Sequence, residues 1–198
     1  MKVNENLNKF YNENCIDCIK NIDFTKLDNA INLILNVRKK KGRIFFIGVG
    51  GSAANCSHAN NDFRKLANLD SYCLTDNTAE LTARTNDDGW ENVFSEMLKT
   101  YSLKAKDIIY VMSVGGGDLK KNVSINIIKA IKYAKQKNSK IISVVAKKNG
   151  YAAKNSDIPI ILKVKNKSLV TPISESVQSL IWHSIVSDPR IQQNKTVW

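Results

Sequence analysis

Apolar and polar positions along this 198-residue chain predict a regular succession of strands and helices. Short runs rich in β-branched and aromatic residues, each bounded by turn-forming residues, have the composition of strands. The predicted strands are 43–48, 71–75, 107–112, 140–145 and 158–163. The other segments repeat apolar residues at helical spacing, as Leu27, Ile31 and Ile34 do. The predicted helices are 3–20, 25–40, 52–66, 77–85, 90–103, 122–137 and 174–187.

The predicted strands are apolar at consecutive positions, as in IIYVMS and KIISVVA, which indicates burial on both faces. Alternation of such strands with helices is typical of an α/β fold with a doubly wound, five-stranded parallel sheet flanked by helices. We expect one domain over residues 1–198, in which the N-terminal helices of residues 1–41 pack on an α/β core of residues 42–198. In such folds, ligands bind at the carboxyl ends of the strands.

Composition narrows the class of partner. The formal net charge is +12, but the lysines are scattered over predicted outer helix faces and no stacking aromatic residues alternate with them. We therefore expect no nucleic acid as a partner. No apolar run reaches the roughly 18 residues of a membrane helix, and the N-terminus lacks the features of a signal peptide, so we expect a cytoplasmic protein without a membrane partner. The four cysteines lack the context of a redox or zinc motif and are expected to be reduced thiols.

The segment RIFFIGVGGSAANCSHANND, residues 43–62, carries the first candidate chemistry. A strand breaks into glycines, then Ser52, and a helix follows. Glycines let the backbone approach a ligand, and the first N–H groups of a helix attract anions such as phosphate. His58 and Asp62 lie four residues apart, so they share one helix face. This combination suggests an enzyme that acts on a phosphorylated small molecule.

A second glycine-rich loop follows the third predicted strand. It runs from Ser113 through Gly115 and Gly116 to Asp118, and Ser124 precedes the next helix. Two such loops at the same edge of the sheet strengthen the case for a phosphorylated ligand. Neither loop has the complete spacing of the common ATP-binding or NAD-binding motifs, so those cofactors are disfavoured.

Four segments resemble the sugar isomerase (SIS) domain family: GVGGSAANCSHANND, LTDNTAELTARTNDDGW, the SVGGGD loop and TPISESVQSLIWH. Over nearly its whole length the chain looks most like the sedoheptulose 7-phosphate isomerases, or phosphoheptose isomerases, within that family. The resemblance implies a homotetramer with active sites at subunit interfaces. It also implies aldose–ketose isomerisation of sedoheptulose 7-phosphate to D-glycero-D-manno-heptose 7-phosphate, which supplies heptose for lipopolysaccharide or capsule.

The resemblance implies roles for particular residues. Asp62 and His183 match the family's proton-transferring groups, and isomerisation of a hydroxy-ketone needs such a base and donor. Some members bind zinc, at positions that are His58, Asp62, Glu175 and His183 here, so zinc is the candidate cofactor. The implied substrate-binding residues are Gly51, Ser52, Asn55, Asp87, Ser113, Gly115, Gly116, Ser124 and Glu175.

The chain departs from the family pattern at several of these positions. Val49 stands where the family usually has asparagine, Asp62 where it has glutamate, and Glu175 where its zinc site has glutamine. The second loop, SVGGGDLKKNVS, is longer than the family's compact serine/threonine turn. These differences have the character of a subfamily, and they leave the exact sugar open.

Structural roles compete with these functional ones. Ser124 suits the N-cap of a helix over 125–137, and Glu175 falls in a predicted first helical turn, where a carboxylate stabilises the helix dipole. Trp182 and Trp198 are expected to be packing groups. Two other functions also stay open, an isomerase of another sugar phosphate and a non-catalytic module that binds a sugar phosphate. The histidine and carboxylate pairs favour catalysis, because a sensor needs the phosphate loops alone.

Overall fold

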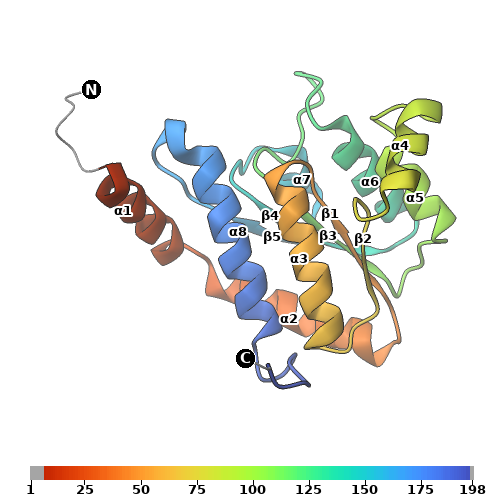
Figure 1. Cartoon of the computed structure of the whole chain (residues 1–198), viewed down its shortest axis with the longest axis horizontal. Coiled ribbons are helices and arrows are strands. Elements are labelled where there is room, and N and C mark those ends of the chain that lie inside the picture. The colour runs from red at the N-terminus through yellow and green to blue at the C-terminus, as the bar shows by residue number, and fades with distance from the viewer. Residues whose placement is uncertain (1–6, 197–198) are drawn as a thin grey trace.

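The structure, a computed structural model, describes residues 7–196 and is built around one parallel sheet (Figure 1). Its strands are β1 (Ile44–Ile47), β2 (Ser71–Cys73), β3 (Ile108–Ser113), β4 (Lys140–Val145) and β5 (Ile158–Ile161). The strand order is β2-β1-β3-β4-β5, and every neighbouring pair is parallel. The predicted fold class is therefore confirmed. The chain order reverses between β1 and β3, which is where doubly wound folds open a ligand crevice at the carboxyl ends of the strands.

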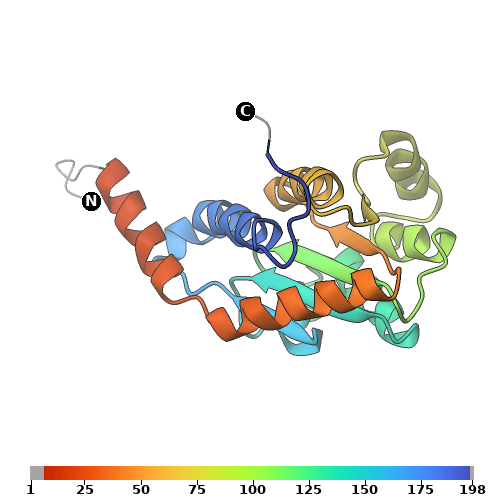
Figure 2. The ribbon, with the colours of Figure 1, turned by 90° about the horizontal axis from the view of Figure 1, so that it is seen from below.

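Alternate side chains of the strands enter two separate cores. Phe46, Tyr110 and Met112 lie in one core, with residues of α1 (Leu7–Lys20), α2 (Phe24–Lys39), α3 (Gly51–Lys65) and α8 (Val170–Val186). Phe45 and Val111 lie in the other core, with residues of α5 (Val93–Thr100), α6 (Ile125–Gln136) and α7 (Tyr151–Asn155). Burial on both faces explains why the strands are continuously apolar. In Figure 2, α3 and α8 lie together on one side of the sheet.

The helix α4 (Thr78–Asp87) differs from the others because none of its residues is buried. It packs mainly against α5, at the edge of the molecule beyond β2 (Figure 1). Its side chains are mostly exposed, so α4 has a free surface that the fold of one chain does not use.

Differences from the predicted elements have local causes. α8 begins at Val170, before Pro172, because proline is tolerated in a first helical turn. α6 begins only at Ile125, since Asp118 and Val123 pair as an antiparallel bridge ahead of it. The five-residue α7 was not predicted, since so short a helix shows no periodicity. Residues 3–6 of the first predicted helix lie outside the described residues.

Two further sequence expectations concern side chains. Trp182 is fully buried in the core and packs as predicted, whereas Trp198 lies outside the described residues. The cysteines, at positions 15, 18, 56 and 73, are free thiols. Among residues 7–196, no helix has the length and apolar character needed to cross a bilayer.

Candidate active site

The first glycine loop joins the end of β1 to α3, as the sequence predicted. Gly50 precedes the helix with φ of 63° and ψ of −131°, a conformation that side chains rarely adopt. Gly51 is the first residue of α3, and a Cβ there would come within 2.5 Å of the Glu175 carboxylate. Glycine at this position therefore leaves room for a side chain from α8.

Glu175 lies at a different helix terminus from the one predicted. Because α8 begins at Val170, Glu175 is beyond its first turn. Its carboxylate instead lies against Gly51, at the N-terminus of α3, where the positive end of the helix dipole favours an anion. The predicted dipole interaction is thus made with α3, and the prediction that it is made with Glu175's own helix is wrong.

A buried glutamine fixes α8 against the start of α3. Ser52 Oγ donates a hydrogen bond of 2.9 Å to Gln178 Oε1, and both residues are almost fully buried. Asn55 Nδ2 donates to the carbonyl oxygen of Glu175 at 2.9 Å. Gln178 was not predicted as a site residue from the sequence, although a single amide within the apolar stretch VQSLIW is the kind of signal that marks a buried polar contact.

His58, Asp62 and His183 form the one cluster of potential metal ligands found among the described residues. Their ligand atoms lie within 4.8 Å of one another, although the residues come from two helices. His58 Nε2 is 3.9 Å from Asp62 Oδ2, and the rings of His58 and His183 are perpendicular with centroids 5.3 Å apart. Asp62 is 17% exposed and His58 is 58% exposed, so the cluster lies at the surface with the carboxylate recessed.

Neighbouring groups orient this cluster. His183 Nδ1 lies 2.9 Å from the carbonyl oxygen of Ser179, one helical turn earlier. If Nδ1 carries the proton and donates it there, Nε2 keeps a lone pair for a metal or a substrate proton. Asn61 Nδ2 donates to Asp62 Oδ1 at 2.9 Å, which leaves Oδ2 toward His58. The buried Trp182 ring contacts both imidazole rings, edge-on at His58 and stacked on His183.

The donor set of the cluster fits a zinc ion. Two imidazoles and one carboxylate are ligands that zinc accepts, and a catalytic zinc has three protein ligands and one open position. The fourth predicted ligand, Glu175, is not in this cluster, because its carboxylate lies at Gly51. His58, Asp62 and His183 are the residues that could hold the metal within one chain.

The second glycine loop is a closed turn supported by its own polar groups. Ser113 Oγ accepts a hydrogen bond from the Gly116 N–H at 3.0 Å. Ser124 occupies the N-cap position of α6, but it has a left-handed backbone with φ of 51° and makes no capping hydrogen bond with its side chain. The predicted capping role of Ser124 is wrong. Its hydroxyl is therefore not committed to the helix.

Asp87 is the one predicted site residue that lies on α4. It ends α4, is exposed, and accepts a hydrogen bond of 2.8 Å from Asn86 Nδ2. α4 packs against α5, whereas the histidine cluster lies on α3 and α8 (Figure 1). Within one chain, Asp87 is therefore on a different helix from the cluster, and its hydrogen bond is with Asn86 rather than with a cluster residue.

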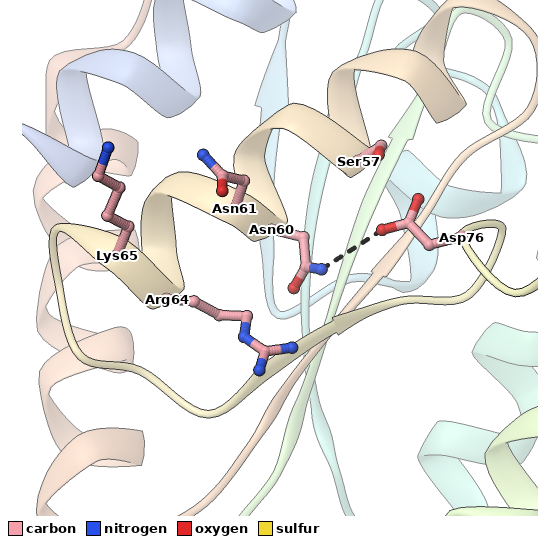
Figure 3. Close-up of a pocket in the computed structure, with 6 residues that line it drawn as sticks. All are labelled: Ser57, Asn60, Asn61, Arg64, Lys65 and Asp76. Atoms are coloured by element: carbon pink, nitrogen blue, oxygen red, sulfur yellow. Dashed lines mark hydrogen bonds between the residues drawn. The ribbon is translucent and has the colours of Figure 1, made fainter.

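A polar pocket flanks α3 beside the cluster (Figure 3). Its volume is about 470 Å³, and the residues drawn around it are Ser57, Asn60, Asn61, Arg64, Lys65 and Asp76. Asn60 Nδ2 donates to Asp76 Oδ2 at 3.4 Å across the pocket. The predicted site residues do not line it, although Asn61 connects it to Asp62.

These features define a class: an α/β protein with glycine loops at a topological switch point and an acid–base cluster shared by α8 and the helix that follows the first loop. The chain belongs to the SIS domain family, because the model of that family, described as "SIS domain", matches residues 11–146. The predicted family resemblance is confirmed.

Individual relatives agree with this assignment. The chain is 31% identical over 194 residues to phosphoheptose isomerase 2 of Campylobacter jejuni, covering 91% of each sequence. It is 28% identical over 150 residues to the lincomycin biosynthesis protein LmbN of Streptomyces lincolnensis, which is 73% of this chain but only 54% of that relative. The structure of phosphoheptose isomerase GmhA from Neisseria gonorrhoeae matches with a TM-score of 0.75 and 25% identity, over 89% of this chain and 91% of that one.

Proposed function

We propose that this protein is a sugar-phosphate isomerase that converts sedoheptulose 7-phosphate to D-glycero-D-manno-heptose 7-phosphate. The observation that carries the proposal is the convergence of His58, Asp62 and His183 from two helices, one of which, α3, begins at the first glycine loop. The similarity to a phosphoheptose isomerase over 91% of both chains supports the same reaction. Heptose synthesis for a surface polysaccharide is the corresponding cellular role.

The reaction is an internal redox exchange between two carbons. Asp62 removes a proton from C1 of the ketose, and His183 gives a proton to the carbonyl oxygen at C2, so that an enediol forms. A proton then leaves the C1 hydroxyl and another is added to C2, which oxidises C1 and reduces C2. Asp62 Oδ2 faces the site because Oδ1 already accepts the hydrogen bond from Asn61. A positioned acid or base typically contributes about 10²–10⁴-fold to the rate.

The glycine loops are the proposed phosphate anchor. Predicted contacts there are Gly51, Ser52, Ser113, Gly115, Gly116 and Ser124, with Asn55, Asp87 and Glu175 toward the sugar. A helix rises about 1.5 Å per residue, so His58 lies about 9 Å along α3 from Ser52. An extended heptose phosphate is long enough for that distance, whereas a triose phosphate is too short. Anchoring a remote phosphate holds the reacting carbons in place.

Zinc is the proposed cofactor, held by His58, Asp62 and His183, with Glu175 as a fourth ligand only after its side chain leaves Gly51. When bound, zinc would polarise the substrate carbonyl as a Lewis acid. The proposed assembly is a homotetramer with active sites at subunit interfaces. The unburied helix α4 and the exposed positions of His58 and His183 support an interface on these surfaces.

The test is to incubate metal-free and zinc-supplemented protein with sedoheptulose 7-phosphate and to follow aldose formation by NMR. We expect turnover in the zinc-supplemented sample. Turnover that is equal in both samples would retain the enzyme and remove zinc from the proposal. If neither sample shows turnover, the proposed reaction is wrong. Glu13→Gln, an exposed change on α1, is the control for preparation effects.

A further inference from the structure

The side chain of Trp182 contacts both histidines of the cluster. Its ring stacks on that of His183, with the centroids 3.5 Å apart and an angle of 26° between the planes. The same ring meets His58 edge-on, at 4.7 Å and 65°. His58 lies on α3 and His183 on α8, two helices that pack side by side (Figure 1). One indole therefore connects the two helices at the cluster.

The indole is fixed in the core, whereas the imidazoles are at the surface. Trp182 is fully buried among the apolar residues of the core that α3 and α8 share. His183, the next residue along α8, is exposed, and His58 is 58% exposed. A ring in a close-packed core keeps one conformation, but an exposed side chain changes rotamer unless a neighbour holds it. The contacts with Trp182 therefore join two exposed side chains to the rigid part of the molecule.

Few other groups restrain the imidazoles. Within residues 7–196 the His58 ring makes no hydrogen bond, and its Nε2 is 3.9 Å from Asp62 Oδ2. Nδ1 of His183 contacts the carbonyl and hydroxyl oxygens of Ser179, which restrains one edge of that ring. The remaining contacts are aromatic, and stacked or edge-on pairs are the arrangements that aromatic rings prefer.

Packing alone does not account for a tryptophan at this position. The indole Nε1 is buried and has no hydrogen-bond partner among the described residues. A buried donor without an acceptor costs free energy that a phenylalanine would avoid. The feature that an indole has and a phenyl ring lacks is a second fused ring, which lets one side chain contact two imidazoles at once.

The orientation of the imidazoles decides whether they can act together. The two planes are perpendicular, and the ligand atoms of the cluster lie within 4.8 Å of one another. The lone pair of an imidazole nitrogen lies in the plane of its ring, so rotation of either ring turns that lone pair away from a shared ion or substrate. Removing a group that orients such a ring typically changes metal affinity or activity by about 10–100-fold.

We infer that Trp182 is a positioning residue: its buried indole holds the rings of His58 and His183 in the orientation in which both can bind one metal ion or one substrate. This role rests on the proposed function of the two histidines. The ring orientation and the zinc affinity are both measurable without turnover.

The first measurement is NMR of the imidazole rings in the full-length, metal-free protein. The chain has two histidines, so both sets of imidazole signals come from this site. Ring protons that lie over the face of an indole are shifted upfield, and the stacked His183 ring is expected to show this shift. Trp182→Leu should remove the shift, and Trp182→Phe should retain part of it.

Zinc affinity is then measured by competition with a chromophoric chelator. Trp182→Leu is expected to bind zinc about 10–100-fold more weakly than the unaltered protein, and Trp182→Phe less than about tenfold more weakly. Phe94→Leu is the matched control, because Phe94 is a fully buried aromatic residue in the other core, with α5 and α6. It should lower the melting temperature and keep zinc affinity within about twofold, since it is remote from the cluster.

Kinetics with sedoheptulose 7-phosphate give the corresponding test of catalysis. Trp182→Phe is expected to lower kcat with little change in KM, because the proposed phosphate anchor lies at the glycine loops. A loss of zinc affinity or of kcat in the Trp182 variants supports the inference. It is overturned if both quantities are unchanged, or if Phe94→Leu loses as much. Should Trp182→Leu fail to fold, Trp182→Phe decides by the same comparison.

Failure of the proposed function has a different signature. If the unaltered protein binds zinc but shows no turnover, the proposed reaction is wrong, and the zinc affinities still decide the role of Trp182. If it isomerises the sugar without zinc, kcat decides that role. If it neither binds zinc nor isomerises, the proposed function and the inference are both overturned.

Discussion

At the scale of single residues, Asp62 is the group on which the proposed chemistry depends most. It is more recessed than His58, and Asn61 orients one of its oxygens. Replacing the carboxylate with an amide removes the base and keeps the shape, so Asp62→Asn is expected to lower kcat by about 10²–10⁴-fold. Isomerisation rates measured by NMR test this, and an unchanged melting temperature shows that the variant is folded. A folded variant with the full rate would exclude Asp62 as the base.

The cysteines give a second prediction at this scale. Burial raises the pKa of Cys18 to about 11 and that of Cys73 to about 11, and it raises the pKa of Cys56 as well. A thiol with a pKa near 11 is only about one part in a thousand thiolate at pH 8, and the thiolate is the reactive form. A thiol reagent should therefore label at most Cys15, which is half-buried, in the native protein and all four thiols in denaturant. Rapid labelling of two or more native thiols would contradict this burial.

At the scale of elements, an ion pair joins the start of β1 to the start of β3. Arg43 Nη2 lies 2.7 Å from Asp107 Oδ2, and the N–H groups of Arg43 and Lys104 also donate to this carboxylate. The Asp107 side chain is fully buried. Asp107→Ala leaves the guanidinium without its carboxylate, with the carbonyl oxygen of Ser102 as its remaining acceptor among the described residues, and leaves two backbone N–H groups unpaired. It is therefore expected to cost about 3–5 kcal/mol of unfolding free energy.

Chemical denaturation measures that cost. Asp28→Asn is the matched control, because it breaks the exposed pair of Asp28 with Arg190 and should change stability little. An equally small effect of Asp107→Ala would mean that the buried pair does not hold the strands in register.

The strands were largely predictable from the sequence, because a short apolar run bounded by turn residues is typical of a buried strand in a parallel sheet. All five strands form, in segments within the predicted ranges or one residue beyond them. Contacts between elements distant in sequence were not predictable by pattern. The displacement of Glu175 to Gly51 and the burial of Gln178 depend on how α8 packs against α3. Ser124 does not form the predicted capping hydrogen bond, and this depends on the Asp118–Val123 bridge that precedes it.

At the scale of the whole molecule, the sheet topology determines which parts of the site one chain can assemble. The switch point between β1 and β3 places the glycine loops at one edge, and α3 and α8 together bring His58 to His183. Helical periodicity alone predicted that His58 and Asp62 share one face of a helix. That His183 belongs to the same site was predicted only from the family resemblance. Asp87 stays apart on α4, and its role in the site remains a prediction that depends on the proposed assembly.

The most direct measurement of the central claim is isomerisation of sedoheptulose 7-phosphate in D₂O, followed by NMR. Proton transfer through an enediol at Asp62 and His183 predicts that the aldose appears and that deuterium enters at its C2. The same protein with Asp62→Asn should show neither change at a comparable rate. If the unaltered, zinc-supplemented protein forms no aldose and exchanges no proton at C1, the account of this site as a sugar-phosphate isomerase is contradicted.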